Sequence, residues 1–125
     1  MTAYVVAQLS IHDRARYDRY AAAFFPTLQP FGGRLLAADE APQVMEGRWD
    51  REKLVLIAFP DAVSAKAWAA SPAYRAIAVD RLAGSEAVVL LAEGFAGPFQ
   101  PAAGSEGVEK IGVVAGRVGD RTDGE

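Results

Sequence analysis

The chain of 125 residues contains no cysteine and only one histidine, His12. Without cysteine it has no disulfide, no thiol nucleophile and no thiolate metal ligand, a composition that fits a reducing compartment such as the cytoplasm. One histidine and no cysteine also leave zinc and haem without their usual ligand sets. We therefore expect neither a metal nor a cofactor.

Long apolar runs and basic clusters are missing as well. No stretch approaches the roughly 20 apolar residues of a membrane span, and the N-terminal segment MTAYVVAQLSIHDR lacks the basic region and cleavage site of a signal peptide. The 13 Lys and Arg residues are scattered and the net charge is −3, which leaves no positive stripe for nucleic acid. Glycine-rich nucleotide loops and a serine nucleophile elbow are absent too. We expect a soluble, cytoplasmic protein that binds neither membranes nor nucleic acid.

Composition divides the chain near residue 94. Seven of the twelve glycines lie beyond that point, at positions 97, 104, 107, 112, 116, 119 and 124. Such a change favours one folded domain over residues 1–94, followed by a Gly/Pro-rich tail over residues 95–125. Residues 108–118 are the only candidate for a short strand in that tail, and their glycines weaken it.

The hydrophobic pattern predicts the order strand, helix, strand, strand, helix, strand. The predicted strands cover residues 3–11, 34–39, 53–59 and 87–92, and residues 43–48 either continue the second strand or form a short one of their own. Asp13 is placed to cap a first helix that ends near Phe31, with a kink or restart at Pro26 and a left-handed cap at Gly32. The second helical region begins at residue 60 and restarts at Ser71, which precedes a proline.

This order predicts a ferredoxin-like α+β fold, an antiparallel sheet with both helices on one face. The strand over residues 53–59 is almost entirely apolar, and the strand over residues 87–92 is apolar throughout, so both faces of the sheet need covering. A second copy of the chain would cover the open face. We therefore predict a homodimer through that face.

Several short motifs resemble one known family. They are AYVVAQLSIHD from residue 3, Tyr17, Tyr20 and Pro26, GGR at residues 32–34, the EG of VMEGRW, FP at residues 59–60, SPAY at residues 71–74, Arg81, and EG at residues 93–94. Together they resemble domain of unknown function family 1330 (DUF1330) over residues 3–94. The resemblance implies a dimeric alpha+beta barrel without a settled activity. Similar barrels include cofactor-free monooxygenases, muconolactone isomerases and haem-dependent enzymes, so the fold alone does not select a reaction. The chain has no asparagine, the amide used at some cofactor-free oxygenase sites.

Glu46 is the candidate catalytic residue, because it is an acidic side chain within a predicted apolar strand. One interpretation makes it a general base or ligand anchor in a pocket between sheet and helices. The other makes it a structural carboxylate, either paired with Arg34 or Arg81 or accepting hydrogen bonds from backbone donors near the kink. We predict that Glu46 is buried within salt-bridge reach of an arginine, Arg34 or Arg81.

The candidate ligand-binding residues have competing structural explanations. Arg34 and Arg81 are suited to holding a substrate carboxylate, but they are equally suited to pairing with Glu46 or capping a helix. Aromatic side chains at helical spacing line pockets but more often form cores, and His12 at a strand–helix junction is a proton shuttle or a plain turn residue. The aromatic candidates are Tyr17, Tyr20, Trp68 and Tyr74.

Two functional hypotheses follow. The chain is a small-molecule enzyme working by cofactor-free acid–base chemistry, of the oxygenase or isomerase type, or it is a non-catalytic dimer that binds a metabolite or has a structural role. The sequence identifies neither a substrate nor a ligand.

Overall fold

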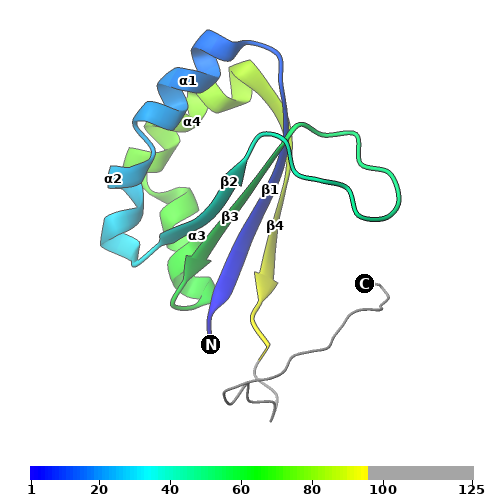
Figure 1. Cartoon of the computed structure of the whole chain (residues 1–125). Helices are drawn as coiled ribbons and strands as arrows, with labels where there is room; N and C mark the ends of the chain where they lie inside the picture. The colour runs from blue at the N-terminus through cyan, green and yellow to red at the C-terminus, as the bar shows by residue number, and fades with distance from the viewer. Residues whose placement is uncertain (96–125) are drawn as a thin grey trace. The chain divides into compact units, whose positions relative to one another are not determined.

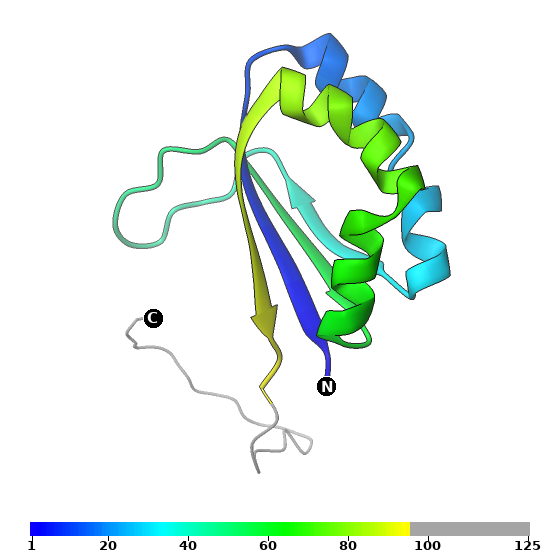
Figure 2. The same cartoon turned by 180° about the vertical axis from the view of Figure 1, so that it is seen from behind.

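The computed structural model describes residues 1–95, and residues Met1–Gly94 form one compact unit. The elements follow in the order β1 (Ala3–Ile11), α1 (Arg14–Ala22), α2 (Phe25–Leu28), the 3-10 helix η1 (Gln29–Phe31), β2 (Arg34–Asp39), β3 (Lys53–Phe59), α3 (Ala62–Ala70), α4 (Pro72–Gly84) and β4 (Ser85–Glu93). All helices lie on one side of the sheet (Figures 1 and 2). The predicted ferredoxin-like α+β fold is confirmed. The predicted tail strand at residues 108–118 lies outside the described residues.

The sheet is antiparallel throughout, with the strand order β2-β3-β1-β4. In the β1–β3 register, Val5 lies opposite Ile57 and Leu9 opposite Lys53, so these residues share the face that the helices cover. Because side chains alternate along a strand, Val6 and the residues opposite it, Leu56 and Leu90, point to the other face. The pairing of β2 with β3 is shifted between Leu35 and Ala37, where the strand bulges.

The helix ends carry the caps that the sequence predicts. Asp13 accepts a hydrogen bond from the backbone N–H of Arg16, and Ser71 accepts one from Tyr74. Helix α1 ends at Ala22, the chain restarts as α2 with Pro26 in the first turn, and Gly32 closes η1 with a φ of 70°. Helices α1 and α4 lie side by side over the sheet (Figures 1 and 2).

One predicted segment is wrong. Residues 43–48 form neither a continuation of β2 nor a separate strand, but belong to a long loop that connects β2 to β3. The side chain of Asp39 accepts a hydrogen bond from the N–H of Ala41, which turns the chain out of the sheet, and Pro42 follows with no N–H to donate. Gly47 has a φ of 88°, a left-handed conformation that does not continue a strand. We call residues 40–52 the β2–β3 arm.

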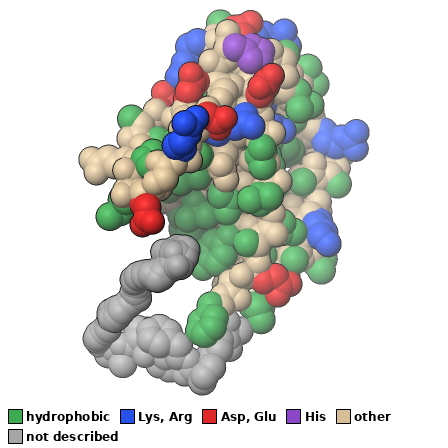
Figure 3. Space-filling model, turned by 90° about the vertical axis from the view of Figure 1, so that its right-hand side faces the viewer, with side chains coloured by type: hydrophobic (Ala, Val, Ile, Leu, Met, Phe, Trp, Pro, Cys, Tyr) green, Lys and Arg blue, Asp and Glu red, His purple; other side chains and the backbone are tan. Residues whose placement is uncertain are grey.

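The face of the sheet opposite the helices is open and apolar. Figure 3 looks onto this face, and hydrophobic side chains gather in its middle. Val88 and Leu90 of β4 are 42% and 51% exposed, and Leu54 and Leu56 of β3 are half-buried. The β2–β3 arm projects on this side (Figures 1 and 2), where Trp49 donates a hydrogen bond to Gln8.

Candidate functional site

A cavity with a volume of about 630 Å³ lies between the sheet and the helices. Its walls come from all four strands and from α1, α2, α3 and α4. The residues that line it include Ala7, Tyr17, Tyr20, Lys53, Trp68, Tyr74 and Arg81. Val79, Leu82 and Val89 also line it and are each at least half exposed, so the cavity opens to solvent between α4 and β4.

A chain of hydrogen bonds crosses the wall of this cavity. The hydroxyl groups of Tyr20 on α1 and Tyr74 on α4 lie 3.1 Å apart, and Arg81 Nε donates to the Tyr74 hydroxyl at 3.3 Å. Tyr74 and Arg81 are seven residues apart, which places them on one face of α4 two turns from each other. The two helices therefore converge on one polar group inside an apolar space.

Burial keeps the hydroxyl of Tyr20 protonated. Removal from water, followed by the influence of Tyr74, raises the pKa of Tyr20 far above its usual range. Tyr20 is therefore a neutral phenol at any ordinary pH. It can donate a hydrogen bond to a ligand oxygen but is not a general base.

Trp68 is held by its neighbours on two sides. Its Nε1 donates to Thr27 Oγ1 at 3.1 Å, and its ring centroid lies 4.2 Å from that of Tyr74 and 5.3 Å from that of Phe59. The indole polar atom is thus satisfied within the core, and the ring supplies apolar wall. The aromatic side chains Tyr17, Tyr20, Trp68 and Tyr74 are thus both buried in the core and part of the cavity lining.

Lys53 is a cavity residue that the sequence analysis missed. It is the first residue of β3, it is only 8% exposed, and its Nζ lies 4.8 Å from the centroid of the Tyr17 ring. Its position in the alternation with Val55 and Ile57 points it to the covered face. That alternation could have identified it, because a lysine on the covered face of a strand is rare.

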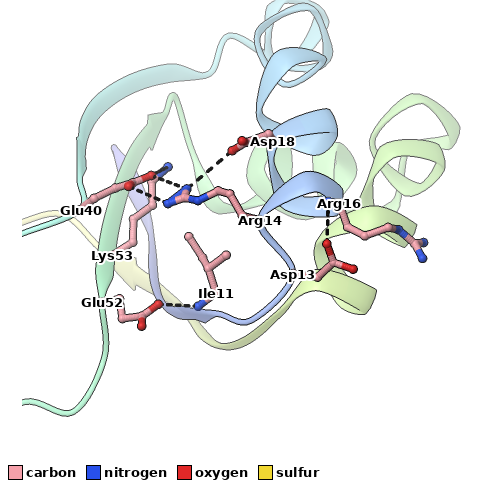
Figure 4. A network of polar contacts seen from close by, with 8 residues as sticks. All are labelled: Ile11, Asp13, Arg14, Arg16, Asp18, Glu40, Glu52 and Lys53. Carbon is pink, nitrogen blue, oxygen red and sulfur yellow. Dashed lines mark hydrogen bonds and ion pairs between the residues drawn. The ribbon is translucent and has the colours of Figure 1, made fainter.

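A smaller, polar cavity of about 400 Å³ lies at the end of the sheet where β3 begins. Figure 4 shows the contacts around it: Arg14 donates to both carboxylate oxygens of Glu40, at 3.0 and 2.8 Å, and Glu52 accepts from the N–H of Ile11 at 2.7 Å. Lys53 lines this cavity too, with Nζ 3.5 Å from Glu40 Oε2. His12 is exposed and lines only this smaller cavity.

The prediction of a buried Glu46 is wrong. Glu46 is exposed on the β2–β3 arm and, within residues 1–95, forms no ion pair with an arginine. The physical reason is the early exit of the chain from the sheet after Asp39, which carries Glu46 away from the helices. Arg34 is also outside the cavity, since it lies opposite Ala58 on the open face. Of the proposed site residues, the structure brings together Tyr20, Trp68, Tyr74 and Arg81.

Residues 1–95 hold no group of three or more His, Asp or Glu side chains arranged to bind a metal ion. No helix in that part is long and apolar enough to cross a membrane.

Comparison with known families gives a direct match. The model of a domain of unknown function, DUF1330, matches residues 2–95, which is most of the chain. The chain belongs to the DUF1330 family. The matched range contains every element of the fold described above, and the resemblance noted in the sequence is confirmed. No curated protein sequence matches this DUF1330 chain.

Solved structures share the fold of this DUF1330 chain. A protein of unknown function from Rhodopseudomonas palustris matches with a TM-score of 0.65 and 11% identity, over 77% of this chain and 84% of that one. A dimeric ferredoxin-like protein of unknown function from Jannaschia sp. matches with a TM-score of 0.55 and 16% identity, over 75% and 100%. The cofactor-independent oxygenase SnoaB from Streptomyces nogalater matches with a TM-score of 0.54 and 14% identity, over 79% and 98%. At these identities the likeness concerns the fold.

Proposed function

We propose that this DUF1330 protein binds a small molecule in the cavity between its sheet and its helices. The observation that carries the proposal is the cavity itself, since its volume of about 630 Å³ lies within the range typical of small-molecule sites. Its lining is mostly aliphatic and aromatic, with the Tyr20, Tyr74 and Arg81 group as a converging polar feature. This combination is the usual composition of a ligand pocket.

Ala7 supports this proposal from the floor of the cavity. Ala7 lies in the middle of β1, an inner strand of the sheet, and its side chain is on the covered face. It is nevertheless only half-buried. A central-strand alanine beneath a helix layer is normally closed off by packing. Its accessibility follows from the space above it, and a larger side chain there would occupy that space.

A thermal-shift screen tests the proposal. A metabolite library is screened against wild type, Ala7→Phe, which fills the cavity, and Ala67→Phe, which places the same ring on the exposed surface of α3. A ligand at a hundred times its dissociation constant should stabilise wild type and the Ala67 variant by roughly 2.7 kcal/mol. The shift should be lost in Ala7→Phe. Ligands that still stabilise Ala7→Phe bind elsewhere, and that result would reject the cavity as the site.

Cofactor-free chemistry on the bound molecule is the second candidate function. It is supported by the description of SnoaB as a cofactor-independent oxygenase and by the hydrogen-bond donors of Tyr20 and Arg81 inside an apolar space. Such donors stabilise an oxyanion that forms when a carbon acid loses its proton. The cavity wall, within the described residues, has no carboxylate to take that proton, so binding without catalysis is the better-supported function.

Proton exchange separates the two candidates. Oxygenation and isomerisation of this type both begin with loss of a C–H proton, so 2-tetralone in D₂O is a suitable general probe. A catalyst would accelerate deuterium incorporation in wild type but not in Ala7→Phe, as followed by NMR. Exchange at the buffer rate with both proteins would remove the catalytic candidate for this class of ketone.

The same chain is proposed to form a homodimer through the open face of its sheet. The support is the apolar patch around Leu56, Val88 and Leu90, and the description of fold neighbours from Jannaschia sp. and Thermobifida fusca as dimeric. A two-fold axis would bury the same patch of both copies at once. The β2–β3 arm projects on this side, with Met45 96% exposed, and is placed to reach over the second copy.

A further inference from the structure

The charges on the wall of the large cavity have one sign. Lys53, Arg75 and Arg81 line it, and no Asp or Glu among the described residues does so. The whole chain carries a net charge of −3, so this local excess of cations runs against the overall balance. A cavity with cationic and apolar walls attracts a ligand that is itself apolar and negatively charged.

Lys53 is the cation most deeply enclosed. Arg75 is exposed and Arg81 half-buried, whereas Lys53 is 8% exposed. An ammonium group has three N–H donors, and its neighbours in the structure are the face of Tyr17 at 4.8 Å and Glu40 at 3.5 Å. A further acceptor can therefore approach Lys53 from the cavity.

Glu40 does not fully neutralise Lys53. It receives two shorter bonds from Arg14, at 2.8 and 3.0 Å, so its charge is shared between two cations. Glu40 is also about half exposed, which weakens its attraction by solvent screening. A buried ammonium in this position gains stability from an additional anion, because a buried charge is costly until it is paired.

Lys53 stands at the junction of two spaces. Its side chain lines both the apolar cavity and the polar one, where Lys53 and Arg14 both contact Glu40 (Figure 4). A molecule with its apolar body against Tyr20 and Trp68 would bring a terminal anionic group to this junction. The site thus has a polar end and an apolar end.

We propose that the ligand of the large cavity is an apolar carboxylate, whose oxygens accept hydrogen bonds from Lys53 Nζ while its hydrocarbon part fills the space between sheet and helices. This inference rests on the proposed function, that the cavity binds a small molecule. It adds the chemical class of the ligand and the residue that selects it.

A matched pair of probes tests the ligand class. 2-Naphthoate and 2-naphthamide have nearly the same size and shape, but only the first carries a negative charge at pH 7. We expect wild type to bind 2-naphthoate at least about tenfold more tightly by calorimetry, as charge-assisted hydrogen bonds would give. Lys53→Met should weaken 2-naphthoate by at least about tenfold and change 2-naphthamide by less than about twofold. Lys66→Met, at an exposed lysine of α3, should change neither.

Each outcome decides one claim. Equal affinity for the two probes in wild type, with both abolished by Ala7→Phe, would overturn the carboxylate proposal and leave the cavity function standing. Binding of both probes that is unchanged in Ala7→Phe would overturn the cavity as the binding site, and no binding of either probe would overturn the carboxylate proposal. If Lys53→Met does not fold, Lys53→Arg replaces it and should keep the preference for 2-naphthoate, since it keeps the charge. A folded variant without the charge, Lys53→Met or Lys53→Gln, that keeps the preference for 2-naphthoate would show that Lys53 is not the selecting residue.

Discussion

The two faces of the sheet differ although they are made by the same strands. On the covered face, Leu9, Ile57 and Phe59 are each 1–2% exposed, while on the open face Val88 and Leu90 are 42% and 51% exposed. Within β3 the contrast holds between neighbours, since Ile57 on the covered face is buried and Leu56 on the open face is half-buried. The helices of the chain cover one apolar face and leave another, which points to a covering supplied from outside the monomer.

The largest effect is expected from a charge on the open face. Leu90 of β4 lies opposite Val6 on that face, and in a two-fold dimer Leu90→Asp places two carboxylates in the interface. We expect the dimer dissociation constant to rise at least about a thousandfold, or about 4 kcal/mol, by sedimentation equilibrium. Val63→Asp, at a position of α3 that is exposed and away from the sheet, is the control and should leave association unchanged. A wild-type monomer, or a Leu90→Asp protein that associates like wild type, would show that the open face is not the interface.

Adjacent residues of β3 give the next largest contrast. Ile57 lies on the covered face and is 2% exposed, and Leu56 lies on the open face and is half-buried. In the monomeric Leu90→Asp background, Ile57→Ala should lower the free energy of unfolding by about 2–5 kcal/mol, as loss of a packed side chain does. Leu56→Ala should lower it by about 1 kcal/mol or less. Urea unfolding measures both, and similar losses at the two positions would contradict the asymmetry of the faces.

The elements that cover one face could be predicted because their rules are local. Asp13 and Ser71 each cap a helix with their own side chain, and Gly32 supplies a left-handed residue where η1 ends. Alternation then assigned the strands, and the positions 3–11, 34–39 and 53–59 match the structure. These features depend on residues a few positions apart, so the sequence contains them directly.

The candidate site could be predicted only in part. Helical spacing put Tyr20 on the apolar side of the first helix and Tyr74 on that of the last, because i, i+3, i+4 and i+7 positions share a helix face. Glu46 was misplaced because an apolar, alternating segment does not reveal where a chain leaves its sheet. The alternation with Val55 and Ile57 could have placed Lys53 on the covered face, but its contact with Tyr17 depends on the approach of α1, a distant part of the chain.

A smaller effect is expected from the ion pairs that join the covering helices to each other. Asp80 of α4 accepts from Arg16 at 2.6 Å and from Arg19 at 3.1 Å, both on α1. The hydrogen bonds from Arg19 and then Arg16 hold the pKa of Asp80 below its usual range. Its contribution to stability is therefore present above the unfolded pKa and is lost as the pH falls through the folded pKa.

Asp80→Asn tests this contribution by its pH dependence. At pH 7 the variant should unfold at a slightly lower urea concentration than wild type, and near pH 3 the difference should shrink as Asp80 of wild type becomes protonated. Added salt should reduce the difference as well, because the pairs are accessible to solvent. Asp18→Asn, which removes only a 3.6 Å contact with Arg14, is the control. An unchanged difference between pH 7 and pH 3 would show that the Asp80 charge does not join the helices.

The smallest effect is expected at Glu46, where the sequence predicted one of the largest. A buried carboxylate paired with Arg34 or Arg81 would cost roughly 3–5 kcal/mol to neutralise. In the structure Glu46 is exposed on the β2–β3 arm, so Glu46→Gln should change the free energy of unfolding by less than about 0.5 kcal/mol. It should also leave ligand binding in the cavity unchanged, because Glu46 is exposed and does not line the cavity that holds Tyr20 and Lys53. Urea unfolding and calorimetry with 2-naphthoate measure the two quantities. A loss of ligand binding without a loss of stability would mean that the arm of one copy reaches the cavity of another, and the separation of the two faces would then not hold in the dimer.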